Sequence, residues 1–180
     1  IDMNAKFTTG HVKIMTRSYA ENQNQLPNDL ALLDVEELLI KLNSEFPDME
    51  WVKRIHFGGL LDVPDANGET RAQGPAAGKA VDLFSTNSKE AERMNIASSI
   101  VKGMMPAKPG QALISNDFAE KFGVKIGDDV TIFGSTMYGS MMFKTFEVSG
   151  TISFGDSILD RGAIIIDISD AQLALDMNDA

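Results

Sequence analysis

The side chains best suited to act as bases or nucleophiles in this chain are two histidines and a set of carboxylates. His11 and His56 both lie where apolar and polar residues alternate, a pattern typical of β-strands. A Ser-His-Asp site needs an imidazole beside an exposed serine, and the chain lacks the Gly-x-Ser-x-Gly motif that would present one. Because the chain has no cysteine, thiolate catalysis and cysteine-based metal sites are excluded as well. We therefore expect both histidines to be structural or surface residues.

A group of acidic and amide side chains around Asp65 and Asn67 resembles part of a calcium-binding loop. If these two residues were the third and fifth ligands of an EF-hand, the first and twelfth positions would also need oxygen ligands. Those positions are Val63 and Gly74, whose side chains carry no oxygen. A solvated hairpin turn explains this group better than a metal site.

Asp156 and Asp160 are close enough in sequence to form a carboxylate pair, and a hydrolase that uses them is one alternative function. No glycine-rich phosphate loop is present, because Gly58-Gly59 lies in a β-like stretch without the Lys-Ser/Thr ending that such loops require. No motif requires a metal ion or an organic cofactor. We therefore predict a chain that is not an enzyme and has no cofactor.

Composition and charge narrow the classes of partner. The 180 residues include 26 acidic and 16 basic side chains, which give a net charge of −10. Such a surface disfavours binding to nucleic acid and to anionic lipid. With 43% apolar residues the chain can bury a core, and no apolar run approaches the roughly 20 residues that span a bilayer. Ile1 is not an initiator methionine, so we expect the chain to be part of a longer protein.

Methionines near one predicted hairpin suggest a contact surface. The segment Met137-Tyr138-Gly139-Ser140-Met141-Met142 falls at the expected tip, and methionine side chains suit adaptable apolar binding surfaces. We predict that Met137, Tyr138 and Met141 contact a partner or cargo. The alternative is that the methionines fill gaps in the core, which we expect for Met142.

These residues must be positioned by a mixture of strands and helices. Periodicity and turn residues predict strands over residues 10–19, 51–63, 71–81, 111–115, 130–133, 142–152 and 163–168. Capping boxes predict helix starts at Asp34-Val35-Glu36-Glu37, Asn87-Ser88-Lys89-Glu90 and Ser169-Asp170-Ala171-Gln172. A further helix follows Ser115 or Asn116 and ends at Gly123.

Two local features add detail. The apolar residues after Asp34 recur at helical spacing until Pro47, so we expect this helix to pack one face on a sheet. Asn67-Gly68 predicts a type I′ hairpin turn, in which both central residues have positive φ.

An ordered set of short motifs carries a resemblance to a known family. The motifs are Ala112-Leu113-Ile114-Ser115, Phe118-Ala119, Phe122-Gly123-Val124, Gly127-Asp128, Val130, Phe146-x-Val148-x-Gly150, Ile164 to Ile168 and Asp170-Ala171-Gln172, with Gly10-His11-Val12-Lys13-Ile14 and Tyr19 at the start. In order and spacing the chain resembles the periplasmic core domain of FtsX-like ABC transporter permeases, the group of the macrolide exporter and lipoprotein-releasing permeases. The resemblance covers most of the chain and is weakest between Glu69 and Met105.

This resemblance implies an α+β fold in two parts. Residues 1–58 with 155–180 would form a membrane-proximal α/β subdomain of strand–helix–strand units. Residues 59–154 would form an inserted, β-rich distal subdomain. The domain would lie on the periplasmic side of the cytoplasmic membrane.

The resemblance also implies a non-catalytic function in transport. The domain would couple ATP-driven motion of transmembrane helices to the export or release of an apolar cargo: a lipoprotein, a lipid, a peptide or a drug. Its partners would be the cognate ABC ATPase, the transmembrane segments of the full permease and a periplasmic carrier or adaptor protein, in a dimeric transporter. In lipoprotein-releasing permeases a hairpin equivalent to the Met137–Met141 segment docks a carrier, although here the connection is short and lacks proline. A free-standing module that binds a ligand or peptide is the alternative.

Overall fold

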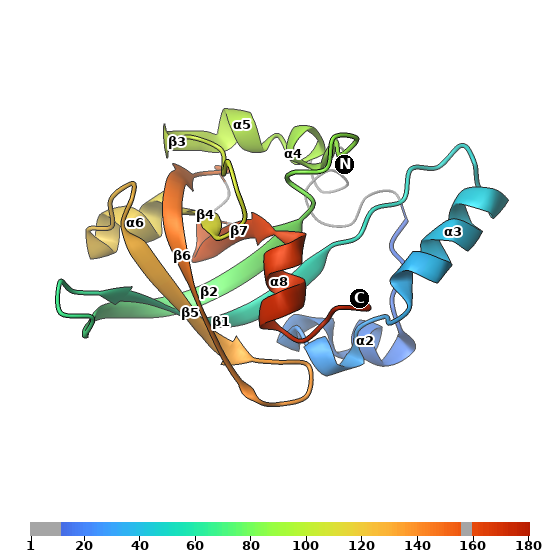
Figure 1. Ribbon diagram of the computed structural model, residues 1–180, viewed down its shortest axis with the longest axis horizontal. Coiled ribbons are helices and arrows are strands. Elements are labelled where there is room, and N and C mark those ends of the chain that lie inside the picture. The colour runs from blue at the N-terminus through green and yellow to red at the C-terminus, as the bar shows by residue number, and fades with distance from the viewer. Residues whose placement is uncertain (1–11, 156–159) are drawn as a thin grey trace.

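The computed structural model describes residues 12–155 and 160–180, which fold as a mixture of helices and strands (Figure 1). The helices are α2 (Arg17–Asn22), η2 (Gln23–Gln25), η3 (Asn28–Leu30), α3 (Val35–Glu45), α4 (Glu90–Arg93), α5 (Ile96–Ser99), α6 (Asn116–Phe122) and α8 (Ile168–Ala174). The strands are β1 (Ile55–Pro64), β2 (Thr70–Val81), β3 (Ile100–Gly103), β4 (Gln111–Ser115), β5 (Asp129–Ser135), β6 (Met141–Ile152) and β7 (Ala163–Asp167). The predicted α+β class is confirmed.

The seven strands form one sheet that closes on itself. The order is β3-β6-β4-β7-β2-β1-β5, and β5 also pairs with β6. Six strands therefore make a ring, and β3 pairs with β6 outside it. Alternate residues of the ring point inward, so that the main core is enclosed by the sheet. Its largest fully buried members are Phe57, Leu61, Ile114, Ile132, Phe146, Ile164 and Ile166.

Two helices complete this core and confirm part of the sequence reasoning. Phe118 of α6 and Leu175, just after α8, belong to the same buried cluster as the inward strand residues. The Ser115 hydroxyl accepts a hydrogen bond from the Phe118 N–H at 3.1 Å and so caps α6. Gly123 ends this helix in the left-handed conformation, as predicted.

The three predicted capping boxes are wrong. Asp34 has left-handed φ and its side chain makes no cap. The Glu90 side chain is buried and forms ion pairs with Arg54 and Arg93, instead of accepting a hydrogen bond from a backbone N–H at the start of its helix. The cap of α8 is Asp167, whose carboxylate accepts a hydrogen bond from the Ser169 N–H at 3.0 Å, two residues earlier than predicted.

The β1–β2 hairpin turns where expected but with another geometry. Of the two central residues of the turn, Gly68 has positive φ and Asn67 has negative φ. The Asp65 carboxylate accepts hydrogen bonds from the N–H groups of Asn67 and Glu69, and Gly68 donates to the Asp65 carbonyl. The turn is therefore type I followed by a glycine bulge, rather than type I′.

The predicted N-terminal strand over residues 10–19 is also wrong within the described part, which begins at residue 12. Residues 12–16 are irregular, and α2 begins at Arg17. Thr16 causes the change, since its hydroxyl accepts from the Tyr19 N–H and donates to the Leu30 carbonyl. The N-terminal strand–helix–strand unit is accordingly not formed, because no strand precedes β1 among the described residues.

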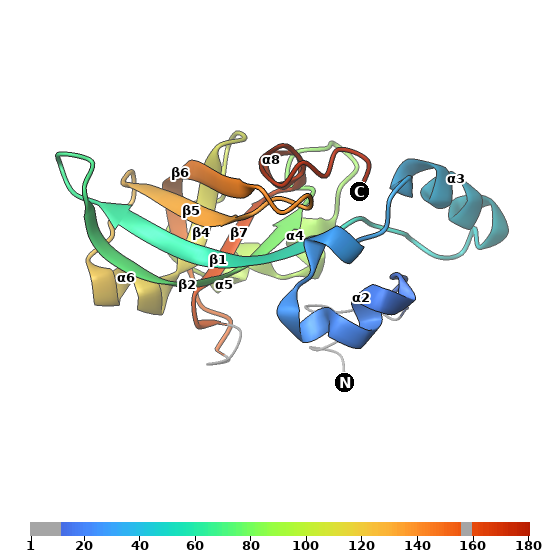
Figure 2. The same cartoon turned by 90° about the horizontal axis from the view of Figure 1, so that it is seen from below.

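Helix α3 stands away from the sheet at one end of the molecule (Figures 1 and 2). None of its residues is buried. The expectation that it packs on a sheet is therefore wrong, and its apolar face borders a cavity instead.

The closed sheet contains strands from both predicted subdomains. Strand β7, from the predicted proximal part, lies between β4 and β2 of the predicted distal part. The division into residues 1–58 with 155–180 and residues 59–154 stays a prediction. Over residues 12–155 and 160–180, the structure shows no helix of the length and apolarity that crossing a membrane requires.

Candidate functional site

The predicted contact loop connects β5 to β6 as a tight turn over residues 136–140. The Thr136 N–H donates to the Ser140 carbonyl at 2.8 Å, and the Gly139 N–H donates to the Thr136 carbonyl at 3.0 Å. The Met137 N–H donates to the Leu175 carbonyl at 2.9 Å. The loop is thus fixed both internally and to the end of α8.

The three predicted contact residues divide into two kinds. Tyr138 and Met141 are 76% and 81% exposed, whereas Met137 is only 8% exposed and belongs to the core. Met142 is buried too, as expected. Met141 and Met142 differ because successive side chains of β6 point to opposite faces of the sheet. The core alternative therefore describes Met137, and the contact role of Tyr138 and Met141 stays a prediction.

The exposed pair is part of a larger apolar area, which we call the outer apolar surface: Leu60, Phe133, Tyr138, Met141 and Phe143. Leu60, Phe133 and Phe143 are cross-strand neighbours on β1, β5 and β6. The rings of Phe133 and Phe143 are 6.5 Å apart between centroids. All five side chains are exposed, and Phe143 is 70% exposed. Sequence reasoning missed three of the five, because the register of β5 with β1 cannot be read from their spacing.

A groove adjoins the outer apolar surface at Tyr138. It has a volume of about 670 Å³ and lies between residues 25–29 and the β5–β6 loop. Its floor includes Gly58 and Gly59 of β1. Tyr138 therefore stands between an apolar face and a recess of the molecule.

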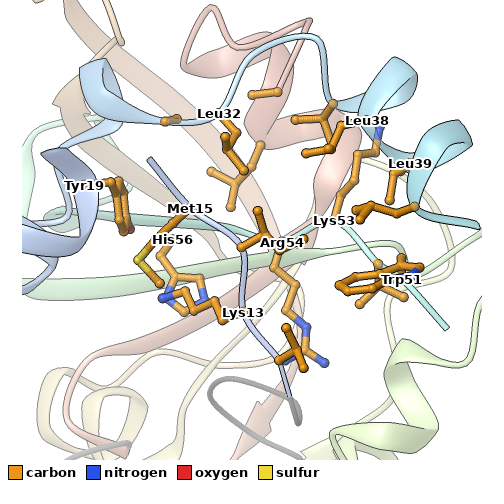
Figure 3. Close-up of a pocket in the computed structure, with 18 of the residues that line it drawn as sticks. Lys13, Met15, Tyr19, Leu32, Leu38, Leu39, Trp51, Lys53, Arg54 and His56 are labelled. Atoms are coloured by element: carbon orange, nitrogen blue, oxygen red, sulfur yellow. The ribbon is translucent and has the colours of Figure 1, made fainter. Parts of the chain in front are cut away.

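A second cavity, also of about 670 Å³, lies between α3 and the start of β1 (Figure 3). Its wall is completed by the irregular segment before α2, Tyr19, the residues around η3, the segment 48–56, Arg93 and the C-terminal residues Met177 and Ala180. Leu32, Leu38 and Leu39 lie on one side, whereas Lys13, Arg54 and His56 lie on the opposite side (Figure 3). The cavity therefore has an apolar wall and a basic wall. We call it the α3 cavity.

The basic wall has a positive electrostatic environment. Burial is the main cause that lowers the pKa of His56 from 6.5 to about 4, and the charges of Lys79, Lys13 and Arg54 lower it further. Burial also lowers the pKa of Lys79 to about 8, with Arg54 the next cause. His56 is therefore neutral at pH 7 and surrounded by cations.

An ionic network fixes the position of Arg54 in this wall. Its guanidinium donates to both carboxylate oxygens of Glu90, at 2.6 and 3.2 Å. Arg93 donates to Glu90 at 2.9 Å and also contacts Glu50. Glu90 is only 1% exposed, so its charge depends on these two partners.

The other candidates for chemistry prove to be structural where they are described. Asp62 is buried and accepts from the Gln73 amide at 3.0 Å. Backbone hydrogen bonds from Glu69 and Asn67 lower the pKa of Asp65. Asp160 accepts from the Ser153 hydroxyl and from the Phe154 and Gly155 N–H groups.

Asp156 and His11 lie outside the described residues. Among the described ones, no three His, Asp or Glu side chains come together as a metal site.

Comparison with known proteins identifies the family. The MacB-like periplasmic core domain matches residues 2–179, which is nearly the whole chain. No curated protein matches the chain. The resemblance to FtsX-like permeases is thereby confirmed. The chain belongs to the family of MacB-like periplasmic core domains, which are extracytoplasmic domains of ABC transporter permeases.

Proposed function

We propose that this domain transmits motion of the membrane part of an ABC permease to a partner or an apolar cargo, which it contacts through the outer apolar surface. The observation that carries the proposal is the exposure of Met141 and Phe143 on the same face of β6, with Phe133 opposite Phe143 on β5. Clustered apolar side chains on a solvent-exposed surface mark interaction sites more often than isolated apolar side chains do. Methionine and aromatic side chains are also enriched where proteins contact each other.

The closed sheet supports the mechanical part of the proposal. In a ring of six hydrogen-bonded strands, displacement of one strand is resisted by two neighbours. The β5–β6 loop is further tied to the end of α8 by the Met137–Leu175 hydrogen bond. A force applied elsewhere on the ring would therefore reach the outer apolar surface with little internal deformation.

The partners follow from the family rather than from the geometry of this chain. They are the cognate ABC ATPase, the transmembrane segments of the same permease and, at the outer apolar surface, a periplasmic carrier or adaptor protein or the cargo itself. The permease would work as a dimer. Cargo classes that suit an apolar contact are lipoproteins, lipids, peptides and drugs.

The test uses the permease that contains this domain, with Phe143→Glu and Met141→Glu as separate variants. Both side chains are exposed, so the melting temperature of the domain should change by less than about 2 °C. Transport, measured as cargo released per ATP hydrolysed, should fall at least about tenfold, because a charge in an apolar contact must be desolvated.

The matched control is Leu173→Glu, since Leu173 is 67% exposed on α8 and lies outside the outer apolar surface. It should leave transport unchanged. Full transport by both surface variants would overturn the proposal, and an equal loss in the Leu173 variant would show a general effect of added charge.

A further inference from the structure

Helix α3 has an apolar face that the described residues, 12–155 and 160–180, leave unburied. Val35, Leu38, Leu39 and Leu42 all line the α3 cavity, and each remains partly exposed. Leucine and valine side chains that remain partly solvated gain stability when they are fully buried. The helix is therefore arranged to bury this face against something else.

The shape of the α3 cavity favours a small occupant. Its volume of about 670 Å³ falls within the roughly 300–1,000 Å³ of small-molecule sites. It is bordered by seven parts of the chain: residues 12–15, Tyr19, the η3 region, α3, residues 48–56, Arg93 and the C-terminal residues. A wall on several sides suits a narrow molecule better than the broad surface of another protein.

The cations of the basic wall favour a ligand with a negatively charged group at one end. Lys13, Arg54 and His56 face the leucines across the cavity (Figure 3). Arg54 and Lys53 are paired with Glu90 and Glu36 respectively. Lys13 lies over the ring of Tyr19, with its Nζ 5.7 Å from the ring centroid. Among residues 12–155 and 160–180 no carboxylate forms an ion pair with Lys13, so a negative group at this wall would meet an unpaired cation.

Acidic side chains at the cavity do not cancel this preference. Asp48 and Glu50 also line it, but Glu50 is engaged by Arg93 and Lys89. The depressed pKa values of His56 and Lys79 both have neighbouring cations among their causes. The cavity lining contains four cationic side chains and two carboxylates, although the chain as a whole has a net charge of −10.

From these observations we propose that the α3 cavity binds a single-chain alkyl carboxylate, with the chain along the leucines of α3 and the carboxylate at Lys13. This site is separate from the outer apolar surface and does not rest on the function proposed there. Walls from several parts of the chain favour a free amphiphile over a lipid that remains in a bilayer.

The experiment follows Trp51, which lines the cavity and is the only tryptophan in the chain. Sodium dodecanoate, kept below its micellar concentration, should change the Trp51 emission saturably, with one site by calorimetry. Dodecanol and dodecyltrimethylammonium, which have the same chain, should bind at least about tenfold more weakly. Equal binding of the cationic amphiphile would overturn the proposal.

Two pairs of variants locate the site. Leu39→Glu places a charge on the apolar wall, whereas Ile40→Glu places it on the neighbouring residue, which is 73% exposed and does not line the cavity. Lys13→Glu reverses the charge at the basic wall, and Lys125→Glu makes the same change on an exposed residue elsewhere. Leu39→Glu and Lys13→Glu should each weaken dodecanoate binding at least about tenfold, and the two controls by less than twofold. Because α3 contributes no buried residue, and Lys13 and Lys125 are exposed, these changes should not unfold the domain.

Two further outcomes distinguish other occupants and would also overturn the proposal. In the first, the domain floats with phosphatidylglycerol vesicles, Lys13→Glu abolishes this flotation, and dodecanoate does not bind. The cavity would then be a site for a membrane surface. Concentration-dependent dimers in sedimentation, lost in Leu39→Glu, would assign the helix face to a second copy of the chain.

Discussion

At the scale of single residues, His56 links the basic wall to stability. Its pKa in the folded protein is about 4 instead of 6.5. Between these values the unfolded chain binds a proton that the folded chain does not, so the free energy of unfolding should fall as the pH falls from 7 toward 4. For this one group the loss from pH 7 to pH 5 is about 2 kcal/mol.

Urea unfolding at pH 7 and pH 5 measures this loss. His56→Gln cannot titrate, so it should lose about 2 kcal/mol less than the unchanged protein over the same interval. Equal losses in the two proteins would show that His56 does not contribute to acid sensitivity.

Residue types predicted part of the candidate site. The methionine-rich segment at the expected hairpin tip predicts Tyr138 and Met141 as contact residues, and both are exposed. Met137 has the same character in sequence but turns into the core. The difference lies in its hydrogen bond to Leu175, 38 positions further along the chain, which local sequence cannot indicate.

At the scale of elements, two neighbouring glycines of β1 have different environments. A Cβ on Gly59 would lie 2.3 Å from the Phe133 carbonyl oxygen of β5, which is backbone and cannot turn aside. A Cβ on Gly58 would meet only the Leu26 side chain, at 3.7 Å. Gly59 thus permits the close approach of β1 to β5 that closes the ring.

Gly59→Ala should therefore destabilise the domain by about 2–4 kcal/mol, since the two strands would have to separate. Gly58→Ala is the matched control and should stay within about 0.5 kcal/mol. Thermal melting of the two variants gives the comparison. Similar melting temperatures would mean that β1 and β5 can shift apart without cost.

Local patterns predicted most elements, with errors near their ends. The strands β2, β4, β6 and β7 lie close to their predicted ranges, because their apolar runs are bounded by turn residues. The N-terminal strand was wrong since Thr16 starts a helix that alternation alone does not reveal. The capping boxes were wrong because the side chains of Glu90 and Asp34 have other roles or none.

At the scale of the whole molecule, ring closure has a consequence for cooperativity. Strand β7 of the predicted proximal part lies between β4 and β2 of the predicted distal part, so neither part keeps all its hydrogen bonds without the other. We expect slow amides of β7 and of β6 to exchange with deuterium at the same opening free energy, that of global unfolding. Amides of α3 should exchange at lower free energy, because this helix has no buried residue.

Native-state hydrogen exchange in low denaturant tests this expectation. If β5 and β6 opened together at lower free energy than β7, residues 59–154 would behave as a subdomain of their own. The closure could not be predicted from sequence. It depends on pairings such as Leu60 with Phe133, whose partners are 73 positions apart.

The opposite orientation of Met141 and Met142 has a chemical consequence outside the cell's reducing interior. Peroxides reach an exposed thioether first and convert it to a polar sulfoxide. Met141, on the outside of β6, is open to this reaction, whereas Met142 is shielded by the core. Mild oxidation would therefore make the outer apolar surface more polar while the fold stays intact, and sulfoxide reduction would restore it.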